Sequence, residues 1–140
     1  MELYQSLLGR VFTDSKGQTR PLVLDDILFV APYNMQVRRL EKALPQGAKV
    51  GSVDRFQGQE APVVIVSLCS SAGEFGTRGL GFILDRNRLN VALSRAQALA
   101  IVVGDPNIAA TPTNSTKELA LLNTFCHLVR PQDAGNPMLD

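Results

Sequence analysis

Two polar segments, each leading into a strongly apolar run, contain most of the residues that could act on a ligand. Residues 51–60 read GSVDRFQGQE and lead into the apolar run at 63–66, and residues 87–96 read NRLNVALSRA and lead into 100–103. Buried parallel strands read as continuous Val, Ile and Leu runs, and ligands of open α/β sheets bind beyond the strand ends. Polar residues gathered beside such strands are therefore expected to contact a ligand rather than fill a core.

Arg88 and Arg95 are the first candidates for binding a polyphosphate. The helix predicted at 85–97 carries both, and their spacing projects them from nearly the same side. A guanidinium group is always charged and binds phosphate through a planar fork. Two surface arginines in salt bridges are the alternative, and Arg86 is either a solvated charge or a nucleic-acid contact. The sole histidine, His127, is expected to be structural.

The segment 51–60 offers further candidates. Asp54 is expected to cap a short helix, which would explain it without a ligand. Gly58 would let the backbone approach a ligand closely. Glu60 precedes an apolar strand, where a carboxylate is costly to bury without a partner such as a ribose hydroxyl or an arginine. A surface turn is the alternative for this part of the chain.

Strands that alternate with helices predict a mostly parallel sheet flanked by helices, an α/β fold. The strands are expected at 27–31, 49–53, 63–68 and 99–103, and the helices at 34–44, 85–97 and 117–128. Right-handed crossovers place the carboxyl ends of parallel strands along one edge, so Asn34, Asp54 and the turn at Gly104 share that edge. Tyr33 and Asn34 could present a stacking ring and an amide there, although Asn34 is explained at least as well as a helix N-cap.

The predicted domain covers residues 26–130. Residues 1–25 read as a weakly helical and then polar segment that has no partner strand and continues from sequence upstream. Residues 70–81 are rich in Gly and Ser and read as a mobile loop or small hairpin. Residues 131–140 read as a disordered tail.

Composition narrows the class of protein. With 140 residues the chain can form one core without disulfides or a structural metal. A net charge of +1 gives no global argument for nucleic acid, so such a role must depend on a local patch. Cys69 and Cys126 are expected to be buried thiols in a reducing compartment. No apolar run approaches the ~20 residues that cross a bilayer, so a cytoplasmic protein, or a fragment of one, without a membrane partner is expected.

Three sequence blocks resemble motifs of a known family. APYNMQV at 31–37, VGSVDRFQGQEAPVVIVS at 50–67 and RNRLNVALSRA at 86–96 resemble motifs IV, V and VI of superfamily 1 helicases. The nearest branch is the one that holds the nonsense-mediated-decay RNA helicase and the replication nuclease-helicase. The resemblance covers about residues 27–104. The stretch SAGEFGTRGLGFILDRNRLN is similar to bacterial proteins that join a RecB-like nuclease region to such a helicase.

The resemblance implies a second RecA-like motor domain, of the P-loop NTPase type, with a sheet between two helical layers. In that family ATP binds between two such domains. The motif VI arginine that reaches the γ-phosphate corresponds to Arg95, and the motif V glutamate that contacts the ribose corresponds to Glu60. Gln57 and Gly58 shape the same loop, and Arg88 is assigned to the ATP site with them.

The same resemblance implies a nucleic-acid partner, single-stranded DNA or RNA. Motifs IV and V line the single-strand groove in the family, which assigns Tyr33, Asn34, Ser52 and Asp54 to that groove. Arg86 is added as a nucleic-acid contact. The other expected partner is the first RecA-like domain of the same parent protein.

The sequence contains no G-x-x-x-x-G-K-[ST] phosphate loop. In the family, the first domain supplies that loop and the carboxylates that bind Mg²⁺, so ATP and Mg²⁺ are implied for the parent protein. This chain alone is expected to be inactive and to bind ATP weakly. An apolar patch where the first domain docks would allow non-physiological self-association.

Two other functions are compatible with the sequence. A catalytically silent RecA-like interaction module would keep the shape of the domain and lose Arg95 and Glu60, both of which this chain retains. A free-standing Rossmann-like nucleotide-binding enzyme would need a Gly-rich turn after its first strand. Residues 31–34 read APYN and contain no glycine, so this reading is disfavoured.

Overall fold

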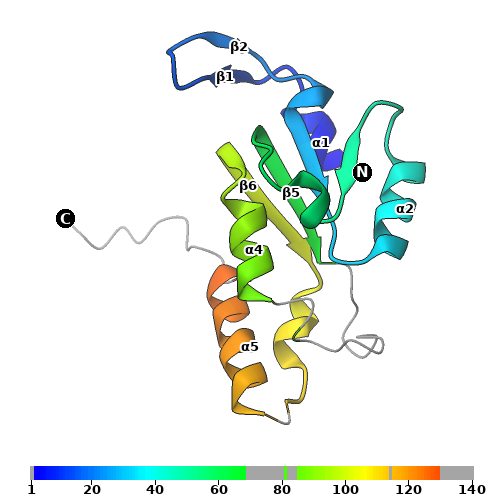
Figure 1. The fold of residues 1–140 in the computed structure, drawn as a ribbon, viewed down its shortest axis with the longest axis vertical. Helices are drawn as coiled ribbons and strands as arrows, with labels where there is room; N and C mark the ends of the chain where they lie inside the picture. Colours follow the sequence, from blue (N-terminus) through cyan, green and yellow to red (C-terminus); the bar gives the residue numbers. More distant parts are fainter. Residues whose placement is uncertain (1, 69–80, 82–84, 114, 130–140) are drawn as a thin grey trace, which may run out of the picture.

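Four parallel strands form the central sheet, in the order β4-β3-β5-β6 (Figure 1). The structure is a computed structural model that describes residues 2–68, 81, 85–113 and 115–129. The strands are β3 (Ile27–Val30), β4 (Lys49–Gly51), β5 (Ala61–Leu68) and β6 (Ala96–Gly104). The helices packed on the sheet are α1 (Glu2–Leu7), α2 (Asn34–Ala43), α4 (Arg86–Leu93) and α5 (Thr116–Val129). The predicted α/β fold with a parallel sheet is therefore confirmed.

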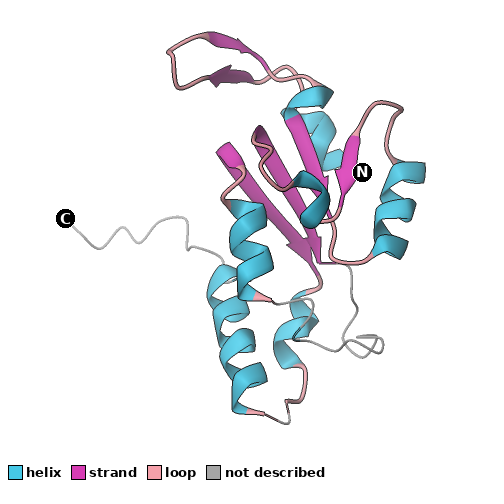
Figure 2. Cartoon of the chain, in the orientation of Figure 1, coloured by secondary structure: helices cyan, strands magenta, loops and turns pink. Residues whose placement is uncertain are grey.

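Helices cover both faces of the sheet (Figure 2). Because successive strand residues point to opposite faces, β3 sends Leu28 and Val30 to one side and Ile27 and Phe29 to the other. The first side packs against α4 and α5 and the second against α1 and α2. The ring of Tyr4 in α1 meets that of Phe29 edge-on, with centroids 5.9 Å apart.

The first 25 residues contribute more structure than the sequence predicted. Strands β1 (Val11–Thr13) and β2 (Thr19–Pro21) pair with each other as an antiparallel hairpin, so the expectation of no partner strand is wrong. The hairpin projects beyond the sheet (Figure 1), but its Phe12 and the following Leu22 are buried in the same core as Ile27. A short 3₁₀ helix, η1 (Leu24–Asp26), then leads into β3.

Several predicted element ends shift because tertiary pairing overrides local propensity. Helix α4 ends at Leu93, where 97 was expected, because Ala96 already pairs with Ala61 at the start of β5. Helix α2 begins at Asn34 itself, so the N-cap is Tyr33, and no side-chain hydrogen bond caps that helix.

Cys126 is half-buried. The predictions for Cys69, for residues 70–80 and for 131–140 lie outside the described residues.

Candidate functional site

Helix α4 runs antiparallel to the strands, so its two ends lie at opposite edges of the sheet. It follows the carboxyl end of β5 and precedes the amino end of β6. Arg88, near its start, lines a small cavity with Pro32, Ser52 and Leu68, which follow or end strands at the carboxyl edge. Arg95 comes after the helix, at the amino edge. Arg95 lies two residues beyond the last residue of the helix, so the prediction that one helix carries both arginines is wrong.

At the amino edge, Glu60 and Arg95 are brought together by strand pairing. The amide of Ala61 donates a hydrogen bond of 3.0 Å to the carbonyl of Arg95. Arg95 is half-buried and its Nε donates to the carbonyl of Val91 at 3.3 Å. Among the described residues no carboxylate pairs with its guanidinium group. The Glu60 side chain is exposed, so the argument that it would be buried at a cost is wrong.

The loop from Asp54 to Glu60 crosses from the carboxyl edge to the amino edge beside α4. It begins with a 3₁₀ turn, η2 (Asp54–Phe56), whose Phe56 is buried in the core that contains Ala92 of α4. Gln57 is exposed, and Gly58 has a φ of +81°, a backbone conformation that favours glycine. The expected N-cap at Asp54 is not formed, because the turn starts one residue earlier.

Gly51 allows close packing where this loop leaves β4. A Cβ on Gly51 would lie 2.5 Å from Cδ of Arg55 and 3.0 Å from Cε2 of Phe56. Ser52 is half-buried, and its Oγ accepts a hydrogen bond of 3.4 Å from the amide of Arg55. The turn η2 is therefore held close against the end of β4.

The residues predicted to contact nucleic acid lie toward the carboxyl edge. Tyr33 is half-buried and packs against the core on the α4 side, so its ring is only partly available for stacking. Asn34, Asp54 and Arg86 are exposed. Arg86 stands at the start of α4, where the carboxylate of Asp85 accepts a hydrogen bond of 3.0 Å from the amide of Arg88.

Sequence reasoning missed one cationic residue near this edge, Lys117. It lies in the first turn of α5 and lines a cavity of about 640 Å³ together with Arg86. The only sequence signal for Lys117 was a lysine at the start of an amphipathic helix. Such a signal does not tell a ligand contact from a solvated charge.

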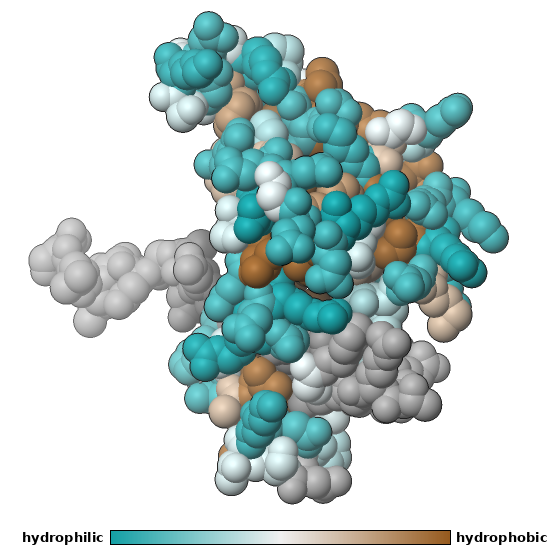
Figure 3. All heavy atoms as spheres, in the orientation of Figure 1, coloured by the Kyte–Doolittle hydropathy of each residue, from teal (hydrophilic) through white to brown (hydrophobic). Residues whose placement is uncertain are grey.

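The described surface includes some exposed apolar side chains. Leu99 and Val103 of the edge strand β6 are 42% and 44% exposed. On the face shown in Figure 3, hydrophilic residues predominate and the apolar ones form small separate areas. None of the helices in the described part has the length and apolar character needed to span a membrane.

Comparisons with known proteins show that this chain is similar to part of several helicases. It is 36% identical over 116 residues to a putative helicase, mov-10-B.1, of Danio rerio, a match that covers 72% of this chain and 12% of that protein. It is 42% identical over 96 residues to the putative helicase MOV-10 of Gallus gallus, covering 57% of this chain and 10% of the relative.

A third relative, the ATP-dependent helicase upf1 of Schizosaccharomyces pombe, is 39% identical over 82 residues, covering 59% of this chain and 8% of the relative. The chain thus spans about a tenth of the length of these curated relatives. The profile of the AAA domain family matches residues 1–107, which include the whole sheet and helix α4. The chain therefore belongs to the AAA domain family.

Proposed function

We propose that this chain is the second motor lobe of an ATP-dependent nucleic-acid helicase of superfamily 1. Support comes from the similarity to several helicases, one of them described as ATP-dependent, and from the parallel α/β fold. A longer parent protein would contribute the first RecA-like lobe. A link to a RecB-like nuclease region stays part of the proposal.

The observation that carries the proposal is the juxtaposition of Glu60 and Arg95. They come from segments 35 positions apart in the sequence, and the hydrogen bond from Ala61 to the carbonyl of Arg95 fixes them at one edge. Arg95 has no carboxylate partner among the described residues, and the Glu60 carboxylate is exposed. The backbone segments that carry a cation and an exposed carboxylate thus meet at the edge where an incoming lobe could present a nucleotide.

Each of these groups has a defined chemical role in the proposal. The guanidinium group of Arg95 would donate hydrogen bonds to the γ-phosphate and stabilise the charge that spreads over it during transfer. The carboxylate of Glu60 would accept hydrogen bonds from ribose hydroxyls. Gln57 and Gly58 would shape the loop beside them. The first lobe would supply the phosphate loop and the Mg²⁺ ligands, so this chain alone would be inactive and bind ATP weakly.

The carboxyl edge is proposed to contact single-stranded DNA or RNA. Tyr33, Asn34, Ser52 and Asp54 would line the strand, with Arg86 contacting a phosphate. Helix α4 connects this edge to the Arg95 edge. Closure of the two lobes on ATP would therefore move the strand-binding residues together with the arginine.

The test is ATP hydrolysis by the longer helicase that contains this lobe, in the presence of single-stranded nucleic acid. Arg95→Ala is expected to lower kcat at least about 1000-fold, the usual contribution of an arginine finger. Arg39→Ala on α2 is the matched control, because Arg39 is exposed and its side chain forms no hydrogen bond or ion pair with another described residue. The isolated chain should show no turnover.

The outcomes separate the proposal from its alternatives. If turnover survives Arg95→Ala within a few-fold, Arg95 is not the finger and the silent interaction module becomes the better explanation. Turnover by the isolated chain would mean that a self-contained nucleotide site lies within these residues. Equal losses in Arg95→Ala and Arg39→Ala would point to a general effect of surface charge.

A further inference from the structure

A cavity lies between the first turns of α4 and α5, beyond the carboxyl edge of the sheet. Its volume is about 640 Å³. The residues that line it include Arg86, Asn90, Lys117 and Glu118. A smaller hollow of about 120 Å³ shares Arg86 and Asn90 with it and continues along the groove between the two helices. The two hollows lie next to each other and form a groove between α4 and α5. The polar end of this groove, lined by Arg86 and Lys117, is its mouth.

The cations at this mouth have no partner among the described residues. Arg86 and Lys117 are exposed, and neither forms a hydrogen bond or an ion pair with a described group. One amide at the start of each helix is already capped, since Asp85 accepts from the amide of Arg88 and Ser115 Oγ accepts from that of Glu118 at 3.2 Å. The two cationic side chains are therefore the main groups that could hold an anion in this cavity.

The charge of the cavity limits the kind of anion that fits. Arg86 and Lys117 are balanced by the carboxylates of Asp85 and Glu118, so the lining carries no strong positive field. Such a site is poorly suited to a triphosphate with several charges. A phosphodiester carries a single charge, and Asn90 could add an amide donor.

The position of the cavity favours a nucleic-acid strand over a free anion. Arg86 is two residues from Arg88, which shares a cavity with Ser52 and Pro32 at the carboxyl edge. The mouth therefore lies at the same edge of the sheet as the residues that we propose for the single strand. Lys117 lies outside residues 1–107, which the family profile matches.

We propose that Arg86 and Lys117 together bind one phosphate of a single-stranded nucleic acid at the mouth of the α4–α5 groove. The inference rests on the proposed function, because it extends the strand along the carboxyl edge onto α5. It adds Lys117 as a contact that neither the motifs nor the comparisons assign. Phosphate contacts of this kind position a strand without reading its sequence.

The test is the affinity of the 140-residue chain for a short fluorescein-labelled oligothymidylate at several salt concentrations, measured by fluorescence anisotropy. Arg86→Ala and Lys117→Ala are each expected to weaken binding about threefold to tenfold at low salt. The double variant should reduce the slope of log K against log salt by about 0.7, the value for one phosphate contact on a single strand, and each single variant should reduce it by part of that amount. Lys117→Arg should keep the wild-type slope.

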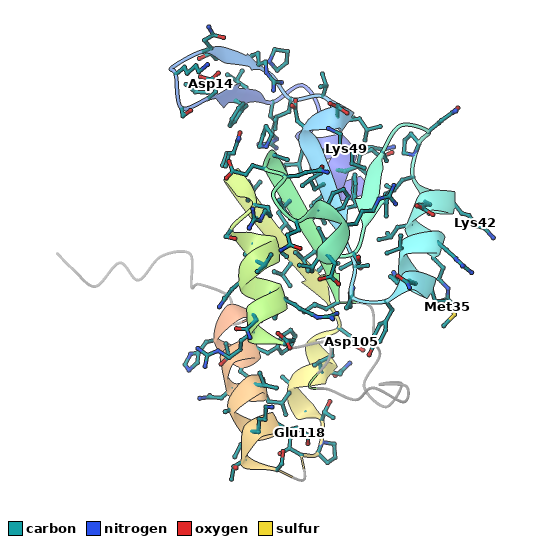
Figure 4. The ribbon with its side chains drawn as sticks, viewed as in Figure 1. Asp14, Met35, Lys42, Lys49, Asp105 and Glu118 are labelled. Carbon is teal, nitrogen blue, oxygen red and sulfur yellow. The ribbon has the colours of Figure 1, made fainter. Side chains whose placement is uncertain are left out.

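Matched controls lie on the other side of the molecule. Arg39→Ala and Lys42→Ala remove the same charges from α2, which packs on the opposite face of the sheet from α5. Figure 4 labels Lys42 on α2 and Glu118 on α5, far apart in the view. The controls should leave the slope unchanged. All four alanine variants should fold, because alanine is the strongest helix former at exposed helical positions.

The inference is overturned if Lys117→Ala binds like Lys42→Ala, or if the wild-type chain does not bind the oligonucleotide at low salt. Failure of the proposed function would look different. In that case Arg95→Ala would retain ATP turnover in the longer helicase, whatever Lys117→Ala does to strand affinity. Inorganic phosphate should compete for the site, so at equal ionic strength it should weaken oligonucleotide binding more in wild type than in Lys117→Ala; an equal effect on both would count against the phosphate site.

Discussion

Arg88 lies in the first turn of helix α4 and Arg95 lies two residues beyond its end, so the two residues are at opposite edges of the sheet. Arg88 shares a cavity with Ser52 at the carboxyl edge, and the carbonyl of Arg95 accepts a hydrogen bond from Ala61 at the amino edge. Helix α4 therefore connects the carboxyl edge and the amino edge, whereas the sequence pattern predicted that both arginines belong to a single site. The separation makes the assignment of both arginines to a single polyphosphate testable.

A double-mutant cycle on the KM for ATP of the longer helicase measures whether the two arginines act together. With about 10 Å between them along the helix, we expect the effects of Arg88→Ala and Arg95→Ala to add, with a coupling free energy below about 0.5 kcal/mol. Steady-state kinetics of the two single variants and the double variant provide the measurement. A coupling above about 1 kcal/mol would place both guanidinium groups on one phosphate chain, as the sequence pattern predicted.

The central sheet could be predicted because its strands are continuous apolar runs separated by helical patterns. Ile27 and Val63 belong to apolar runs that are buried, whereas the run that contains Ile101 forms the largely exposed edge strand β6; all three residues pair in parallel as expected. The hairpin β1–β2 could not be predicted in the same way. Its strands are short and mostly exposed. The hairpin is held in its conformation by a turn at Asp14 and by two buried side chains, Phe12 and Leu22.

Motif resemblance predicted which residues to inspect, but it could not predict where each would lie. Helical periodicity extended α4 to 97 because Leu89, Leu93 and Ala96 keep a helical spacing. In the structure Ala96 pairs with Ala61 instead, so Arg95 leaves the helix and joins Glu60. That pairing depends on contacts between segments far apart in the sequence. Local propensity contains no information on such contacts.

Gly58 allows a test of the loop that carries Gln57 and Glu60. Its φ of +81° lies in the left-handed region, and a Cβ would meet no heavy atom within 4 Å. Any cost of Gly58→Ala is therefore backbone strain, and we expect the free energy of unfolding to fall by about 1–2 kcal/mol. Urea denaturation followed by circular dichroism gives the value.

The control for that strain is Gly81→Ala. Gly81 has no positive φ and also no heavy atom within 4 Å of a Cβ, so its variant should stay within about 0.5 kcal/mol of wild type. Gly58→Asn should lose less than Gly58→Ala, because asparagine tolerates the left-handed region better. Equal stabilities of the two alanine variants would show that Gly58 does not hold this conformation in solution.

Asp26 links the β1–β2 hairpin to the domain through a bidentate salt bridge with Arg20. The guanidinium nitrogens of Arg20 donate to the two carboxylate oxygens at 2.6 and 2.7 Å, and the amide of Val23 donates to the same carboxylate at 2.9 Å. The guanidinium carbon also lies 5.8 Å from the centre of the Phe12 ring. Hydrogen bonding by Arg20 outweighs partial burial and, with the Val23 amide, lowers the pKa of Asp26 below its usual 3.8.

A lowered carboxyl pKa stabilises the fold above the unfolded pKa, and that stability is lost as the pH falls through the folded value. Asp26→Asn should therefore lower the free energy of unfolding by about 1–3 kcal/mol at pH 7, the usual loss for hydrogen bonds to a charged group. The difference from wild type should stay constant between pH 5 and 8 and shrink below the reference pKa of 3.8. Urea titrations over this pH range measure it. Asp25→Asn is the control, because among the described residues the Asp25 carboxylate pairs with Lys49 alone, in an exposed ion pair of 3.0 Å that is worth at most about 1 kcal/mol. A difference for Asp26→Asn that is as small as the control's, or that does not shrink in acid, would mean that the Arg20 pair does not hold the hairpin in place.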